Sequence, residues 1–252
     1  VGVLHLEPVF ADLAAVLAAG EAHQAGIDIY RENPFDPFGR THVYGPWWLV
    51  SGALGLKTVD ALWLGAALGL AFLAVALRVL RPRTRGESAL AFLLLLSPGV
   101  LLGLERANND LVVFLLAALA AWCAARPARA AGLGAVALVV VNAALKFYPL
   151  IALGAVLGRR ESRGWRVALV ALGAVVFAWL WLAQAEHYWN ALTVAPRPVS
   201  IFAYGIGVMP LAWRLLPEAR GLLLAGFLPA LALGAWLCWA QRRRWWELLP
   251  LD

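Results

Sequence analysis

The chain has 252 residues, of which 63% are hydrophobic and only 14% are charged, and its formal net charge is +6. Soluble domains have about 25% charged and about 45–50% apolar residues, so this composition excludes an ordinary soluble protein and predicts a multi-spanning membrane protein. The positive charge does not predict a nucleic-acid partner, because most basic residues cluster between apolar runs. Cys123 and Cys238 lie inside apolar runs, and their spacing matches neither a disulfide framework nor a metal motif.

We expect residues 1 to about 60 on the outer face of the membrane, because the positive loops between the later apolar segments stay in the cytoplasm. Residues 12–26 are typical of a short amphipathic helix that lies along the membrane surface. Asp12 would stand in the first turn of that helix, where an acid is an ordinary capping residue. After a loop rich in Pro, Asp and Gly, residues 44–57 predict a short apolar helix, with Pro46 in its first turn.

A helix that crosses a membrane needs about 20 mostly apolar residues. Three segments reach this length, namely 61–80, 165–185 and 221–240. Four further apolar segments are shorter or interrupted, namely 88–104, 110–125, 130–145 and 150–157. Ser97-Pro98-Gly99 predicts a kink within 88–104. Short and broken helices at membrane depth are tolerated where they line a cavity.

We therefore predict an all-α, polytopic membrane protein with about seven membrane segments and short interfacial helices. It would form a single domain over residues 1–252, in which 1–60 is the outer-face part and 61–246 is the membrane bundle. Four arginine clusters lie between the apolar segments, at 78–85, 126–129, 159–166 and 242–244. Positive loops stay in the cytoplasm, and all four clusters fit there if the turn at Lys146 reaches the outer face.

Five polar residues interrupt the apolar sequence on that outer side, namely Glu105, Arg106, Asn108, Asn109 and Asp110. Asp110 or Asn109 can cap the helix that follows. One interpretation is a solvated loop with a Glu105–Arg106 or Arg106–Asp110 ion pair. The other is the polar floor of an outward-facing cavity, because charges at membrane depth are found in wet sites.

Lys146, at the end of the apolar run 135–145, also has two interpretations. A lysine there can extend its ammonium to the headgroups. Alternatively it is a cation for a lipid phosphate, with Arg106 as a second one.

Residues 105–116, followed by residues 144–150 (Ala-Leu-Lys-Phe-Tyr-Pro-Leu), resemble motifs of the polyprenol-phosphate-dependent mannosyltransferases of glycosyltransferase family 87. That family belongs to the GT-C superfamily of multi-spanning enzymes. The resemblance extends over about residues 12–157 and includes an outer acid, Asp12, and the turn at Tyr44-Gly45-Pro46. The chain departs from the family in having Val16 and Leu17 where a tyrosine usually follows the acid.

The resemblance implies an inverting hexosyltransferase on the extracytoplasmic face of the bacterial inner membrane. The donor would be a polyprenyl-phosphate sugar, expected to be mannose, and the acceptor a lipid or a glycan. Asp12 would be the catalytic base, and Arg106 and Lys146 would stabilise charge on the phosphate. The other expected substrate-binding residues are Glu105, Asn108, Asn109, Asp110, Tyr148 and His187.

We expect no metal, no cofactor and no nucleic-acid partner. Broken helices and cavity charges also suit a transporter or flippase of a lipid-linked or anionic solute. A third alternative is an inactive, truncated member of the family.

Overall fold

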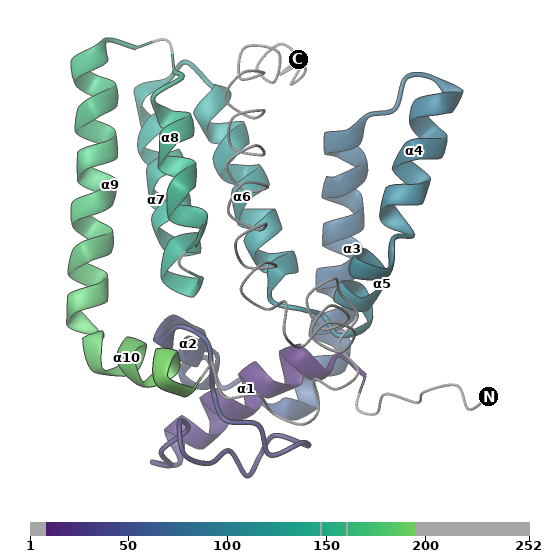
Figure 1. Ribbon diagram of the computed structural model, residues 1–252, viewed down its shortest axis with the longest axis vertical. Helices are drawn as coiled ribbons and strands as arrows, with labels where there is room; N and C mark the ends of the chain where they lie inside the picture. The colour runs from purple at the N-terminus through teal and green to yellow at the C-terminus, as the bar shows by residue number, and fades with distance from the viewer. Residues whose placement is uncertain (1–8, 147, 160, 195–252) are drawn as a thin grey trace, which may run out of the picture. The chain divides into compact units, whose positions relative to one another are not determined.

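The computed structural model describes residues 9–146, 148–159 and 161–194, all of which belong to the first of the two units into which the chain divides, Val1–Arg197 (Figure 1). Within these residues every regular element is an α-helix or a 3-10 helix, so the prediction of an all-α protein is confirmed there. The apolar segment 221–240 and the arginines at 242–244 lie outside the described residues.

Two described helices are long and apolar enough to cross a membrane, Thr58–Leu80 and Arg163–Ala183. The first consists of the 3-10 turn η2 (Thr58–Asp60) and helix α3 (Ala61–Leu80), and the second is α9. A bent pair, α4 (Arg85–Leu95) and α5 (Pro98–Glu105), makes up a third candidate. Its two helices meet at 53°, which confirms the kink expected at Pro98.

Two further apolar helices, α6 (Asp110–Ala125) and α7 (Arg129–Leu145), are shorter than a full span. The described residues therefore show two or three candidate spans, and they do not confirm the expected seven. After α7, the 3-10 turn η3 (Tyr148–Ala152) and α8 (Leu153–Val156) return along α7.

A hydrophobic core joins α6, α7, α8 and α9, and its buried residues are Ala120, Val136, Val139, Val140, Leu153, Val156 and Leu169. Close packing in this core depends on Gly173, because a Cβ there would lie 2.9 Å from both Leu153 and Val136. By contrast, other faces of the long helices carry exposed apolar side chains, such as Trp179 and Leu182 on α9. Such faces fit a hydrocarbon environment.

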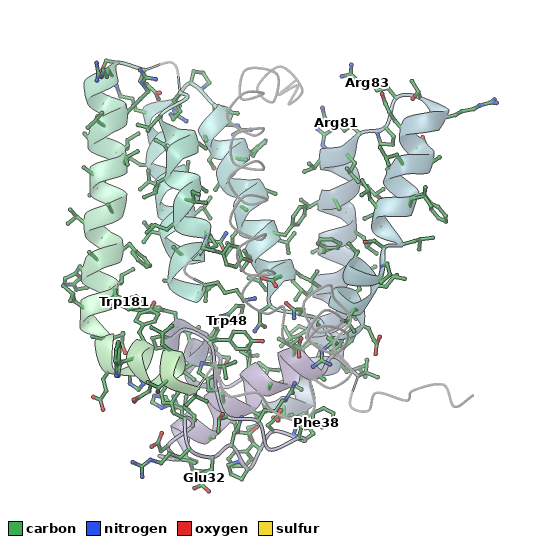
Figure 2. The ribbon with its side chains drawn as sticks, viewed as in Figure 1. Glu32, Phe38, Trp48, Arg81, Arg83 and Trp181 are labelled. Atoms are coloured by element: carbon green, nitrogen blue, oxygen red, sulfur yellow. The ribbon has the colours of Figure 1, made fainter. Side chains whose placement is uncertain are left out.

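The turns α3–α4, α6–α7 and α8–α9 lie at the same end of the bundle (Figure 1). Arg81 and Arg83 are seen at this end in Figure 2, and Arg126 and Arg129 belong to the α6–α7 turn. Three of the four arginine clusters thus share one end, as the sequence predicted.

Helices α1 (Ala11–Gln24), α2 (Val50–Ala53) and α10 (Ala185–Val194) lie at the opposite end, together with the 3-10 turn η1 (Pro46–Leu49). The predicted surface helix is wrong in one respect, because α1 is buried along most of its length. It packs against α2, η1, η2 and α3. Gly20 allows this approach, since a Cβ there would lie 2.7 Å from the backbone nitrogen of Gly52.

Candidate functional site

The start of α1 docks directly onto the polar stretch at 105–110. The backbone N–H groups of Asp12 and Leu13 donate to the carbonyl oxygen of Arg106, and that of Phe10 donates to the carbonyl of Glu105. Asp12 lies in the first turn of α1 as expected, but no described side chain caps this helix with a hydrogen bond, so a capping role for Asp12 is wrong. The carboxylate of Asp12 turns instead to partners far away in the sequence.

Asp12 is buried and forms an ion pair with Arg106. Nη2 and Nε of Arg106 donate to Oδ1 of Asp12 at 2.6 and 3.0 Å. These hydrogen bonds raise the pKa of Arg106. Arg106 therefore pairs with Asp12, and not with Glu105 or Asp110 as the sequence suggested.

A second guanidinium, that of Arg40, reaches the same carboxylate. Its Nη1 lies 3.4 Å from Oδ1 of Asp12, and its Nη2 donates to the carbonyl of Ala11 at 2.6 Å. Arg40 is held by two hydrogen bonds from its guanidinium to the buried carboxylate of Asp36. That carboxylate also accepts the backbone N–H groups of Phe38 and Arg40, so a tight loop fixes its position.

The second oxygen of Asp12 has a different environment. Oδ2 accepts a 2.7 Å hydrogen bond from Nδ2 of Asn108, its one hydrogen-bond partner among the described residues. Oδ1 of Asn108 accepts a 2.9 Å hydrogen bond from the backbone N–H of Asp110. Asn108 therefore joins Asp12 to the start of α6, and Oδ2 of Asp12 keeps a lone pair for another donor.

The backbone between Arg106 and Asn108 is strained. Ala107 has a φ of 43°, in the left-handed region that residues with a Cβ seldom adopt, and it is fully buried. This conformation lets the residues on both sides of Ala107 aim their side chains at Asp12. Strain held by surrounding structure is a feature found at functional sites.

A second polar cluster is centred on Asp110, two residues beyond Asn108. Asp110 Oδ1 accepts hydrogen bonds from Lys146 Nζ at 2.7 Å and from the Tyr148 hydroxyl at 2.6 Å. Burial and then the bond to Asp110 raise the pKa of Tyr148 far above its usual value. The side chain of Asp110 is 54% exposed, so this cluster is open on one side.

Tyr44 lies between the two clusters. The Lys146 ammonium is 5.6 Å from the centroid of its ring. Burial, with a further contribution from the charges of Asp12 and Asp110, raises the pKa of Tyr44 to about 12. The charges of both carboxylates thus act on one tyrosine, and the hydrogen bonds of Asn108 join the two clusters into one site.

Hydrogen bonds from other elements hold the end of α7 in place, and Lys146 directly follows this end. Trp48 Nε1 donates to the carbonyl of Leu145 at 3.1 Å, and the Tyr188 hydroxyl donates to that of Ala144 at 2.9 Å. Gly45 allows the chain to pass here, because a Cβ would lie 2.5 Å from the Ala144 oxygen. In Figure 2, Trp48 and Trp181 lie where α10 and α2 meet the bundle.

No family model, no curated protein and no solved structure matches this chain.

The remaining predicted site residues are placed differently. Glu105 is exposed, and its carboxylate forms no ion pair with another described residue. Asn109 is buried, and neither polar atom of its side chain has a hydrogen-bond partner among the described residues. The side chain of Asn109, the N-cap residue of α6, makes no capping hydrogen bond, so that expectation is wrong, whereas Asp110 lies in the first turn of the helix as expected.

His187 lies outside the two clusters. Its ring packs near Tyr30 and His23, with centroids 5.8 and 6.0 Å away. His42 continues this aromatic group, with its ring 6.0 Å from that of Tyr30. Across the described ranges, no three His, Cys, Asp or Glu side chains are grouped to hold a metal ion.

The structure thus brings together Asp12, Arg106, Asn108, Asp110, Lys146 and Tyr148. It adds Arg40, Asp36 and Tyr44, to which the sequence analysis gave no role. The four-residue spacing of Asp36 and Arg40 was the local signal that could have revealed the first two, since a loop aspartate often binds backbone and side chains a few residues on.

Proposed function

We propose that this chain is a membrane glycosyltransferase that moves a sugar, expected to be mannose, from a polyprenyl-phosphate donor to a lipid or glycan acceptor. We further propose a GT-C-like bundle of about seven membrane segments in the bacterial inner membrane. The end that carries α1 would face the extracytoplasmic side, with the arginine-rich end in the cytoplasm. The observation that carries the proposal is the Asn108 bridge, which joins a buried acid with one free lone pair to an open lysine–tyrosine cluster.

The reaction divides between the two clusters. The acceptor hydroxyl gives its proton to Oδ2 of Asp12 as its oxygen attacks the anomeric carbon. The bond between that carbon and the phosphate oxygen breaks, and the phosphate leaves with the electron pair. Displacement from the opposite side inverts the anomeric centre.

Charge on the departing phosphate is met at the second cluster. Lys146 and Tyr148 supply donors at the outer end of α6. Arg106 has another role than the one expected from the sequence, because two of its donors bind Asp12. It orients the base and balances its charge, as does Arg40.

The test is sugar transfer in membranes that contain the full chain, with radiolabelled polyprenyl-phosphate mannose as donor. Asp12→Asn should abolish the labelled product, whereas Asp28→Asn should not, because Asp28 is exposed and, among the described residues, forms its ion pair with Arg31. Product that persists in Asp12→Asn would remove Asp12 as the base. Absence of product from the folded wild-type chain would contradict the transferase proposal.

A second candidate is a flippase or transporter, favoured by the 53° break between α4 and α5. The same membranes distinguish it. Movement of labelled lipid between leaflets without a new glycosidic bond would support the flippase, and a product that requires Asp12 would support the transferase. If a folded chain shows neither transfer nor lipid movement, the remaining alternative is an inactive member of the family.

A further inference from the structure

The end of the bundle opposite α1 carries arginines that the proposed reaction does not use. Arg126 directly follows the last residue of α6, and Arg129 begins α7 three residues later. Both are exposed. Their guanidiniums are therefore open to a partner at this end of the bundle.

The turn between α6 and α7 is fixed from within by Arg159. Its side chain is 1% exposed and pairs with Glu161. Its guanidinium donates to the carbonyls of Cys123, Ala124 and Ala128 at 3.1, 2.6 and 3.1 Å. Because these carbonyls end α6 and precede α7, the turn is a rigid support for Arg126 and Arg129.

Each of the two exposed guanidiniums lies on a tryptophan. Arg126 Cζ is 3.4 Å from the ring centroid of Trp122, and Arg129 Cζ is 5.7 Å from that of Trp165. A guanidinium that stacks on a ring keeps its N–H groups in its own plane, free for acceptors. In residues 9–194, leaving aside 147 and 160, neither guanidinium has an ion-pair or hydrogen-bond partner.

The same edge has further donors without acceptors. Nε1 of Trp165 and Nε of Arg166 are buried, and no described group accepts a hydrogen bond from either. The described residues of this edge thus include donors that no described acceptor satisfies. A partner that supplies several negatively charged oxygens is the chemical complement of such an edge.

We propose that the Arg126–Arg129 edge, formed by Trp122, Arg126, Arg129 and Trp165, binds the phosphate of an anionic phospholipid headgroup. Trp122 is 45% exposed, and tryptophans of this kind lie at headgroup depth. Trp165 belongs to α9, a candidate span whose other faces expose apolar side chains. A lipid can thus place its phosphate on the arginines and its chains along the helices. The inference does not depend on the proposed transferase activity.

The experiment measures the midpoint of thermal unfolding of the full chain in neutral detergent. Short-chain phosphatidylglycerol, phosphatidylcholine and inorganic phosphate are titrated separately, since a ligand that binds only the folded state raises the midpoint. The variants are Arg126→Gln/Arg129→Gln, Arg126→Lys/Arg129→Lys, and the control Arg83→Gln/Arg85→Gln. The control removes the same charge from the α3–α4 turn at the same end.

Phosphatidylglycerol should raise the midpoint of the wild type and of the control equally, and by less than half as much in the glutamine variant. The lysine variant, which keeps the charge without the planar guanidinium, should fall between them and remains informative if the glutamine variant does not fold. Equal shifts from phosphatidylcholine, or from inorganic phosphate, would overturn the assignment to an anionic lipid. If the control variant loses as much of the phosphatidylglycerol-induced rise as the glutamine variant, the effect is one of general charge. That result would also overturn the proposal.

Discussion

Asp12 and Arg106 are 94 residues apart in the sequence and are joined by two hydrogen bonds, of 2.6 and 3.0 Å, between one carboxylate oxygen and one guanidinium. The side chains are only 10% and 25% exposed, so water screens this pair much less than it screens a surface pair. The pair ties α1 to the segment between α5 and α6. It therefore contributes both to the site and to the fold.

The coupling between Asp12 and Arg106 should be measurable in the free energy of unfolding. A double-mutant cycle with Asp12→Asn and Arg106→Gln should give a coupling energy of about 1–3 kcal/mol. The matched cycle at Asp28 and Arg31, whose side chains are 52% and 86% exposed, should give less than about 1 kcal/mol. Equal coupling energies in the two cycles would contradict the buried character of the Asp12 pair.

Lys146 should matter more to sugar transfer than the other described lysine. Lys146→Met should lower the transfer rate by about 100-fold, because one preorganised cation is lost where negative charge develops. Lys146→Arg should keep part of the rate. Lys57→Met is the control, since Lys57 is exposed in the turn before α3. A rate unchanged by Lys146→Met would remove the lysine from the mechanism.

Gly45→Ala should destabilise the fold by about 1–3 kcal/mol. The added Cβ would lie 2.5 Å from the Ala144 carbonyl oxygen and 3.2 Å from a ring carbon of Tyr188. The control is Gly154→Ala in α8, where nothing lies within 4 Å and alanine is a better helix former. Thermal or urea unfolding of the two variants checks the prediction, which fails if they are equally stable.

His42 should make the protein less stable in mild acid. Burial lowers the pKa of His42 from 6.5 in the unfolded chain to about 4. The neutral ring therefore stabilises the folded state fully above pH 6.5, and this contribution is lost as the pH falls from 6.5 to 4. The full difference corresponds to about 3 kcal/mol.

Unfolding free energies at pH 7.5 and pH 5 check this prediction. The wild type should lose stability between the two values, and His42→Gln should lose less. His23→Gln is a useful control because His23 is exposed. A loss of stability in His42→Gln as large as that of the wild type would assign the pH dependence to other groups.

The sequence predicted the elements whose signal is local. Helices α3 and α6 begin and end where the apolar runs do. Helix α4 ends shortly before Pro98 and α5 begins with it, because a proline has no N–H to donate. The prediction for α1 was less accurate. Its many alanines carry little polarity signal, and small residues such as Gly20 let neighbouring backbones approach from several sides.

The candidate site was predictable only in part, because local patterns do not reveal contacts between segments that are distant in the sequence. Arg106, Asn108 and Asp110 share one short stretch, so the sequence shows them together. Which acid pairs with Arg106 depends on how α1 docks, and no local pattern contains that information. Arg40 was missed because its contact with Asp12 exists only once the loop that holds Asp36 has folded back on α1.

The capping of α7 by Trp48 and Tyr188 also sets an order of assembly. The carbonyl of Leu145 finds its donor 97 residues earlier in the chain, and that of Ala144 finds one 44 residues later. During synthesis from the N-terminus, Trp48 is already present when α7 emerges, whereas Tyr188 is not. A contact between residues far apart in the sequence forms only after the loop between them has closed. The hydrogen bonds at the end of α7 are therefore all in place only late in folding. Lys146 would therefore reach its final position only after α9 and α10 have been made.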